Sequence, residues 1–178
     1  MKSHAAIVLL CLSLFGCAQR ESPPQTVGEI DLQRYQGTWY EIARLPMFFQ
    51  RKCVQAQADY RLRVDGKVAV LNQCRTGDGE WISAAGAAEP VEGRSDRLQV
   101  RFDNWFSRLF PSLTTGDYWV LHLDEDYRIA LVGHPERKYL WLLSREPQLS
   151  TGQREELLRV AREQGYALDE LIWRADNP

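Results

Sequence analysis

The side chains with the most chemistry open to them in this sequence are its four cysteines. Cys17 directly follows a hydrophobic N-terminal stretch, whereas Cys53 and Cys74 lie well inside the chain. A thiol can be acylated, form a disulfide, bind a metal or act as a nucleophile, depending on its surroundings. His122 and His134 do not stand at the spacing of a zinc site, and no G-x-S-x-G motif accompanies them. The cysteines are therefore the first candidates for a chemical role in this protein.

The N-terminus is typical of a lipoprotein precursor. Lys2 and His4 precede the apolar run 5–15, which is too short to span a bilayer and predicts a signal peptide over residues 1–16. The run ends in Leu14-Phe15-Gly16-Cys17, which resembles a bacterial lipobox. We expect cleavage before Cys17 and lipidation of its thiol and new amino group; the alternative is a plain secretory signal with a chance cysteine.

The predicted anchor sets the expected location. Several acyl chains on one residue hold a protein to a membrane far more firmly than one chain does. Ala18, directly after Cys17, fits a sorting pattern for the outer membrane, with the domain facing the periplasm. Residues 17–28 are polar and proline-bearing and predict a tether, followed by a domain over 29–178.

Cys53 and Cys74 form the pair left in an oxidising compartment, and a disulfide between them is expected. A tight turn at Asp65-Gly66 would place Cys74 opposite residue 57 or 58. A direct bond then needs a β-bulge, or a segment around Cys53 that curls back before its strand.

Eight strand-like segments follow one another at close spacing, over 38–44, 55–64, 67–74, 81–88, 97–102, 118–123, 127–132 and 139–144. In one of them Leu98, Val100 and Phe102 alternate with polar residues, the pattern of a half-buried strand. The period then changes to a helical one between a Ser150 N-cap and Gly165. We predict an all-β fold: an eight-stranded antiparallel up-and-down β-barrel with one C-terminal α-helix packed outside.

Composition excludes some partners. The chain has 178 residues, 44% of them hydrophobic, and a formal net charge of −2 with its basic residues scattered. A nucleic-acid partner is not expected, because such proteins carry a basic patch or stripe.

Three ordered motifs carry a family resemblance: Gly37-x-Trp39 with Tyr40–Arg44 behind it, Gly116-Asp117-Tyr118, and Trp141–Arg145. With them the chain resembles a lipocalin over residues 29–174, specifically the bacterial outer-membrane lipocalins and their apolipoprotein D-like relatives. The resemblance implies that Gly37, Trp39 and Arg145 close one end of the barrel.

The resemblance also implies a carrier of small hydrophobic ligands. Together with the lipobox and the aromatic loop over 104–111, it predicts that the ligands are fatty acids or lysophospholipids and that the protein serves cell-envelope lipid maintenance. No cofactor and no enzymatic activity are expected. The ligand-binding residues that the resemblance implies are Tyr35, Tyr60, Asn72 and Trp141, and the direction of the predicted strand adds Tyr118. Related chains often bond a cysteine at the Cys53 position elsewhere; the distal partner is missing here, which leaves Cys74.

A loop over 104–111 is unusually apolar for a connection between strands. Its side chains Trp105, Phe106, Leu109 and Phe110 are expected to contact the membrane or to line the rim of the cavity. Residues 47–49 are expected to form part of the same rim.

Two other functions stay open. Because a few lipocalins are isomerases that use a cavity cysteine, a reduced Cys74 is a candidate nucleophile for a lipid or isoprenoid substrate. A barrel filled by side chains would instead be a protein-interaction module acting through the loop at 105–110. Homodimer formation is left open as well.

Overall fold

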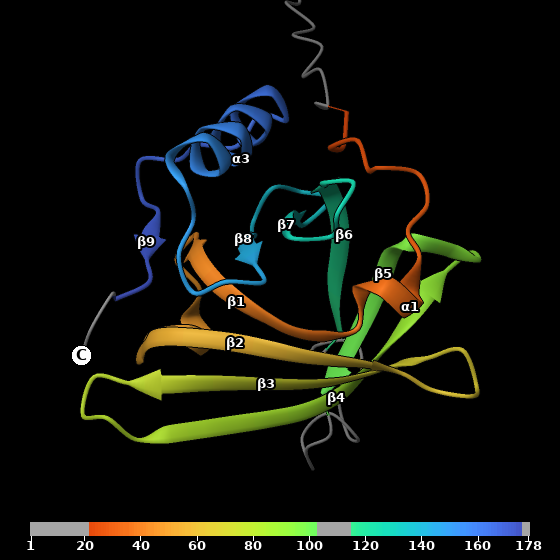
Figure 1. Cartoon of the computed structure of the whole chain (residues 1–178), viewed down its shortest axis with the longest axis horizontal. Helices are drawn as coiled ribbons and strands as arrows, with labels where there is room; N and C mark the ends of the chain where they lie inside the picture. Colours follow the sequence, from red (N-terminus) through yellow and green to blue (C-terminus); the bar gives the residue numbers. More distant parts are fainter. Residues whose placement is uncertain (1–21, 103–114, 176–178) are drawn as a thin grey trace, which may run out of the picture.

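A single antiparallel sheet closes on itself to form the barrel (Figure 1). The computed structural model describes residues 22–102 and 115–175. The strands are β1 (Gly37–Arg44), β2 (Cys53–Leu62), β3 (Val68–Thr76), β4 (Trp81–Val91), β5 (Arg94–Phe102), β6 (Thr115–Leu123), β7 (Ile129–Gly133), β8 (Leu140–Ser144) and β9 (Ile172–Trp173). Neighbours in sequence pair from β2 to β8, and β1 pairs with both β8 and β2. The predicted eight-stranded up-and-down barrel is confirmed, with β9 added at the edge of β1.

The two ends of the barrel differ, and register identifies them. Tyr40 pairs with Ser144 and Arg44 with Trp141, so β1 begins where β8 ends. We call the end where β1 begins the floor; α1 (Leu32–Tyr35) leads directly into it. We call the opposite end the mouth; it carries η1 (Phe48–Gln50), the β3–β4 turn and the β7–β8 turn.

The β2–β3 hairpin differs in register from the sequence-based expectation. The amide of Arg63 donates to the carbonyl of Lys67 (2.8 Å), so the turn holds three residues and Cys74 lies opposite Ala56. A register shift between Cys53 and Gln55 then brings the first cysteine alongside the second. The predicted disulfide between Cys53 and Cys74 is confirmed, with Cα atoms 5.5 Å apart.

One helix, α3 (Thr151–Glu163), packs outside the barrel, as predicted. Its N-terminus has a capping box, in which the Ser150 hydroxyl accepts from the Gln153 amide while the Gln153 side chain accepts from the Ser150 amide. Leu157 and Ala161 are fully buried against the barrel, and β7 beneath them is buried on both faces. Within residues 22–102 and 115–175, no helix is long and apolar enough to cross a membrane.

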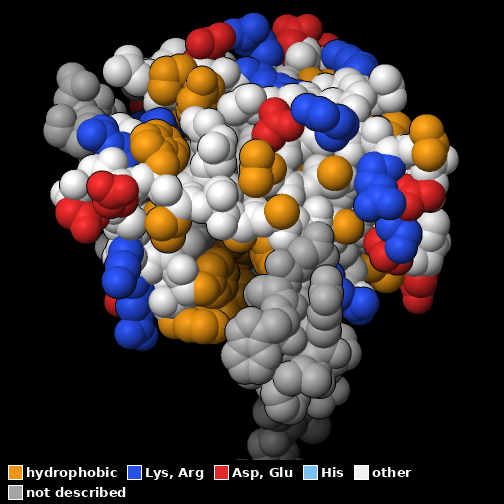
Figure 2. All heavy atoms as spheres, turned by 90° about the horizontal axis from the view of Figure 1, so that it is seen from below, with side chains coloured by type: hydrophobic (Ala, Val, Ile, Leu, Met, Phe, Trp, Pro, Cys, Tyr) orange, Lys and Arg blue, Asp and Glu red, His pale blue; other side chains and the backbone are white. Residues whose placement is uncertain are grey.

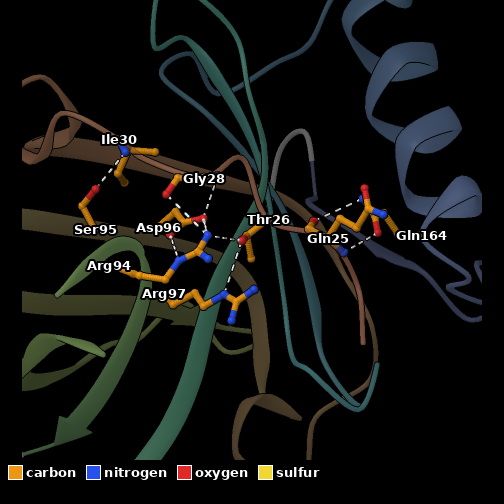
Figure 3. Close-up of polar contacts among 9 residues, drawn as sticks. All are labelled: Gln25, Thr26, Gly28, Ile30, Arg94, Ser95, Asp96, Arg97 and Gln164. Carbon is orange, nitrogen blue, oxygen red and sulfur yellow. Dashed lines mark hydrogen bonds and ion pairs between the residues drawn. The ribbon is translucent and has the colours of Figure 1, made fainter. Parts of the chain in front are cut away.

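Residues 22–31, which we call the strap, lie along the barrel from mouth to floor. Figure 3 shows the polar contacts of Gln25, Thr26, Gly28 and Ile30 within it. The strap overlaps the tether predicted over 17–28. Its amides donate to distant side chains: Gly28 to the carboxylate of Asp96 (2.7 Å) and Ile30 to the hydroxyl of Ser95 (2.8 Å). The Gln25 backbone exchanges two hydrogen bonds with the Gln164 side chain. The strap is therefore fixed to the domain from its first described residues.

Asp96 is the polar centre of the strap contact and is completely buried on β5. Burial alone would raise the pKa of its carboxyl, but the Arg94 guanidinium 2.8 Å away and the Gly28 amide hold it below its ordinary value. The ionised form of Asp96 therefore ties the strap to the barrel.

Candidate functional site: the barrel interior

The floor is closed by Trp39 and Arg145. Trp39 is fully buried at the start of β1, and the Arg145 guanidinium lies 4.0 Å from its ring centroid, a favourable cation–π geometry. The indole N–H donates to the carbonyl of Tyr35 (2.9 Å), and Arg145 donates to the carbonyl of Thr38 (2.8 Å). Gly37 makes the turn into β1 at φ +88°, a conformation that favours glycine.

Three tyrosines form a layer directly above the floor. The hydroxyls of Tyr35 and Tyr118 are 2.8 Å apart, and the ring of Tyr60 lies 5.8 Å from that of Tyr35 and 5.9 Å from that of Tyr118, centroid to centroid. Burial raises the pKa of all three hydroxyls, that of Tyr60 to about 12. They therefore act as neutral hydrogen-bonding groups in an apolar surrounding.

A small cavity lies within this layer. Its lining consists of apolar side chains from the strands and α1 together with the three tyrosines: Leu32, Tyr35, Tyr60, Val68, Val70, Ala88, Leu98, Val100 and Tyr118. The space among them measures about 310 Å³ including the part that opens to solvent, but the room left for a guest molecule is far smaller. This is the room of about one water molecule, so the floor half is almost filled by side chains.

Alkaline titration tests the tyrosine layer. Tyr166, whose hydroxyl donates to the His134 carbonyl, also has its pKa raised by burial to about 12. We expect four of the seven tyrosines to remain largely protonated at pH 11 until the protein unfolds. Raised pKa values favour the fold below pH 10, and this stabilisation is lost as the pH rises through them. Absorbance at 295 nm measures it; full ionisation of all seven in the folded protein at pH 11 would contradict the layer.

The mouth half, by contrast, is open to solvent on one side. Asn72 lies opposite Ala58 on β2 and opposite Ala84 on β4, so these three side chains face the same side of the sheet. Cys74, two residues further along β3, faces this side too, together with its partner Ile82. Ala58 belongs to the interior cluster, which makes this the inner face. Ala84 is nevertheless exposed, and Ile82 is 52% exposed. Figure 2 shows apolar side chains gathered in a hollow on the face seen from below.

A buried polar cluster lies at the mouth end of β1. Arg44, only 3% exposed, donates to the Glu41 carboxylate (2.9 Å) and to the carbonyls of Gln50 and Cys53 (3.0 Å each). Burial raises the pKa of the Glu41 carboxyl, and Arg44 lowers it in part. The Gln50 side chain donates to Glu41 (3.0 Å) and accepts from the Trp141 indole (3.4 Å). These contacts hold the β1–β2 connection against the barrel.

The structure brings together three of the five expected ligand-binding residues. Tyr35, Tyr60 and Tyr118 line the cavity. Asn72 follows Val70 on the inner face toward the mouth, and Trp141 packs partly buried against the interior cluster beside Gln50. Cys17 and the rim residues Trp105, Phe106, Leu109 and Phe110 lie outside the described residues.

The cluster formed by Glu41, Arg44 and Gln50 was not predicted from the sequence. A register shift between Glu41 and Ala43 reverses the alternation of β1 and turns Arg44 inward beside Trp141. Strict alternation along β1 from the inward-facing Trp39 would place the Arg44 side chain on the outer face of the barrel. No pattern in the sequence therefore indicated that Arg44 faces the interior. Among the described residues, no group of three or more His, Cys, Asp or Glu side chains could hold a metal ion.

A closed up-and-down barrel with a plugged floor, an apolar interior and an open mouth defines the class of proteins that enclose small hydrophobic molecules. The sequence matches the model of a lipocalin-like domain over residues 30–176. It is 37% identical to "Outer membrane lipoprotein Blc" of Vibrio cholerae over 96% of this chain and 97% of that one. It is 33% identical to apolipoprotein D of Macaca fascicularis over 80% and 81%. The chain therefore belongs to the lipocalin family.

The fold agrees with solved structures at much lower identity. Insecticyanin from the tobacco hornworm Manduca sexta superposes with a TM-score of 0.67 at 19% identity, over 86% of this chain and 85% of that chain. Lipocalin 12 from rat epididymis gives 0.68 at 16% identity, over 90% and 95%. At these identities the likeness concerns the barrel alone.

Proposed function

We propose that this lipocalin is a lipid-anchored carrier whose interior holds the acyl chain of a fatty acid or lysophospholipid. The observation that supports it most is the layering of the interior, which is solvent-open beside Ile82 and Ala84, apolar further down and closed by Trp39. An amphiphile matches this order, because its chain leaves water while its headgroup stays hydrated at the mouth.

Binding requires the tyrosine layer to rearrange. A water-sized space cannot hold an acyl chain, so Tyr60 and Tyr118 must change rotamer for the chain to approach the floor. Their hydroxyls can then pair with each other or with water, and the apolar wall of Val68, Val70 and Leu98 receives the chain. The wall residues Asn72 and Trp141 belong to the headgroup side of the same proposal.

Titration of residues 22–178 with a fluorescent fatty acid tests ligand binding. We expect saturable binding, and Ala88→Leu, which fills the cavity wall, should weaken it about tenfold, a loss of ~1.4 kcal/mol. Ala87→Leu is the matched control, because the neighbouring residue on β4 faces away from the interior. Thermal melts establish that both variants fold. Binding that never saturates, or that both variants weaken equally, argues against an interior site.

We further propose that the mature chain begins at a lipidated Cys17 and resides in the outer membrane, facing the periplasm. The Vibrio cholerae relative, named an outer membrane lipoprotein, supports this. The intact mass of protein extracted from its own membranes is expected to equal the chain from Cys17 plus its acyl groups. An unmodified N-terminus would contradict the anchor.

The nearly filled floor half favours a second candidate, an interaction module that recognises a protein partner and carries no lipid. Native mass spectrometry separates the two, because a carrier purified from its membrane retains a weighable lipid. The isomerase hypothesis requires a free thiol at Cys74 as its nucleophile. In this structure Cys74 is bonded to Cys53 and has no free thiol.

A further inference from the structure

Two neighbouring phenylalanines are exposed at the mouth. Phe48 is 71% and Phe49 is 54% exposed in η1, and their rings meet edge to face at 5.2 Å. Phe49 also touches Tyr139, directly before β8, with ring centroids 5.6 Å apart. Full burial of a phenylalanine side chain lowers its free energy by about 1.5–3 kcal/mol relative to exposure. Because Phe48 and Phe49 are mostly exposed, they do not gain most of this free energy within the chain. A paired exposure of this kind marks an interaction surface.

The residues that follow the pair are cationic. Arg51 and Lys52 are both exposed, directly after η1 and before β2 begins at Cys53. Aromatic side chains beside cations on one short segment suit a lipid–water interface, where rings enter the acyl boundary and cations bind anionic headgroups. Lys52 distinguishes this surface from a typical protein interface, where lysine is depleted.

The strap places the start of the described chain at the same end. Arg137, in the β7–β8 turn, donates to the carbonyl of Ser22 (2.8 Å), and that turn leads directly into Tyr139. Ser22 is five residue steps along the chain from Cys17, so a fully extended chain between them reaches at most about 18 Å. A membrane that holds Cys17 therefore lies close to the mouth, whereas the floor is roughly 30 Å away along a strand as long as β3.

From these contacts we infer that Phe48, Phe49, Arg51 and Lys52 form a membrane-docking surface, which turns the mouth toward the bilayer that anchors Cys17. This inference rests on the lipid anchor of the proposed function. It deepens that function, because a mouth held at the headgroup layer takes up and releases amphiphiles without their crossing water.

Spin labelling of the mature lipoprotein in vesicles of phosphatidylcholine and phosphatidylglycerol tests the orientation. Phe48→Cys and Val64→Cys each introduce one thiol for a nitroxide, because Cys53 and Cys74 are bonded and Cys17 is acylated in the proposed form. Val64 is fully exposed in the β2–β3 turn at the floor and is the matched control site. We expect the ratio of oxygen to nickel-chelate accessibility to be several-fold higher at 48 than at 64.

Further variants test which side chains dock. In the protein labelled at position 48, Arg51→Ser with Lys52→Ser should lower the accessibility ratio toward the value of an aqueous site, whereas Val64→Ser should leave it unchanged.

Three outcomes overturn the inference. Accessibility ratios at 48 and 64 that both equal the value of an aqueous site do so, and so does membrane contact at 64 alone. Dipolar broadening of label 48 in detergent, which would report a second copy on this surface, also overturns it. Vesicle flotation separates the failures: protein that does not float lacks the anchor, and protein that floats with label 48 in water contradicts only the docking surface.

Discussion

Replacing Trp39 by alanine is expected to lower the free energy of unfolding by about 3–5 kcal/mol, the usual loss for a buried tryptophan. The substitution empties the floor, removes the ring that faces the Arg145 guanidinium and leaves the Tyr35 carbonyl without its indole donor. Urea denaturation of the disulfide-intact protein, followed by far-ultraviolet circular dichroism, measures the loss.

Two variants show whether this effect belongs to the floor. Trp39→Phe keeps an aromatic face for Arg145 but loses the N–H, so its cost should fall between those of the wild type and the alanine variant. Trp81→Ala removes a tryptophan that is 50% exposed at the mouth, and it should change stability by about 0.5 kcal/mol or less. A Trp39→Ala variant as stable as Trp81→Ala would show that the floor is not where the barrel gains its stability.

The barrel could be predicted because its signals are local. Period-two alternation, the Asp65-Gly66 turn and the cap at Ser150 each act within a few residues, and the structure has all three elements. The floor pair of Trp39 and Arg145 was expected from family resemblance, since no local pattern joins residues 106 positions apart. The number of strands could therefore be predicted from local sequence patterns, and the floor pair could be predicted from the family resemblance.

The features that could not be predicted depend on single irregularities or distant partners. One register shift in β1 turns Arg44 inward, and alternation cannot anticipate it. Asp96 lies just outside the strand predicted over 97–102, yet it is buried on β5 because the strap crosses it. The strap has the composition of a linker, and its order comes from amides that donate to side chains more than 60 residues away. Composition does not encode such contacts.

The buried pair of Glu41 and Arg44 should show the second large effect. Arg44→Ala is expected to cost about 3–5 kcal/mol at pH 7, because it leaves the Glu41 carboxylate buried without its cation. The carbonyls of Gln50 and Cys53 also lose their donor, so the β1–β2 connection is released from the barrel. Urea denaturation at several pH values measures both the cost and its pH dependence.

The pH dependence has a definite sign. Burial raises the pKa of Glu41 in the fold, and loss of Arg44 removes a contact that lowers it, so the pKa rises further in the variant. A raised carboxyl pKa favours the fold at low pH, and this contribution is lost as the pH rises through it. The stability deficit of Arg44→Ala should therefore shrink from pH 7 to pH 5.

Two further variants serve as controls. Adding Glu41→Gln to Arg44→Ala should recover part of the lost stability and flatten its dependence on pH. Arg61→Ala, which removes an exposed arginine on β2, should stay near wild-type stability at both pH values. A deficit that is equal at pH 5 and pH 7 would mean that the buried carboxylate is not what Arg44 stabilises.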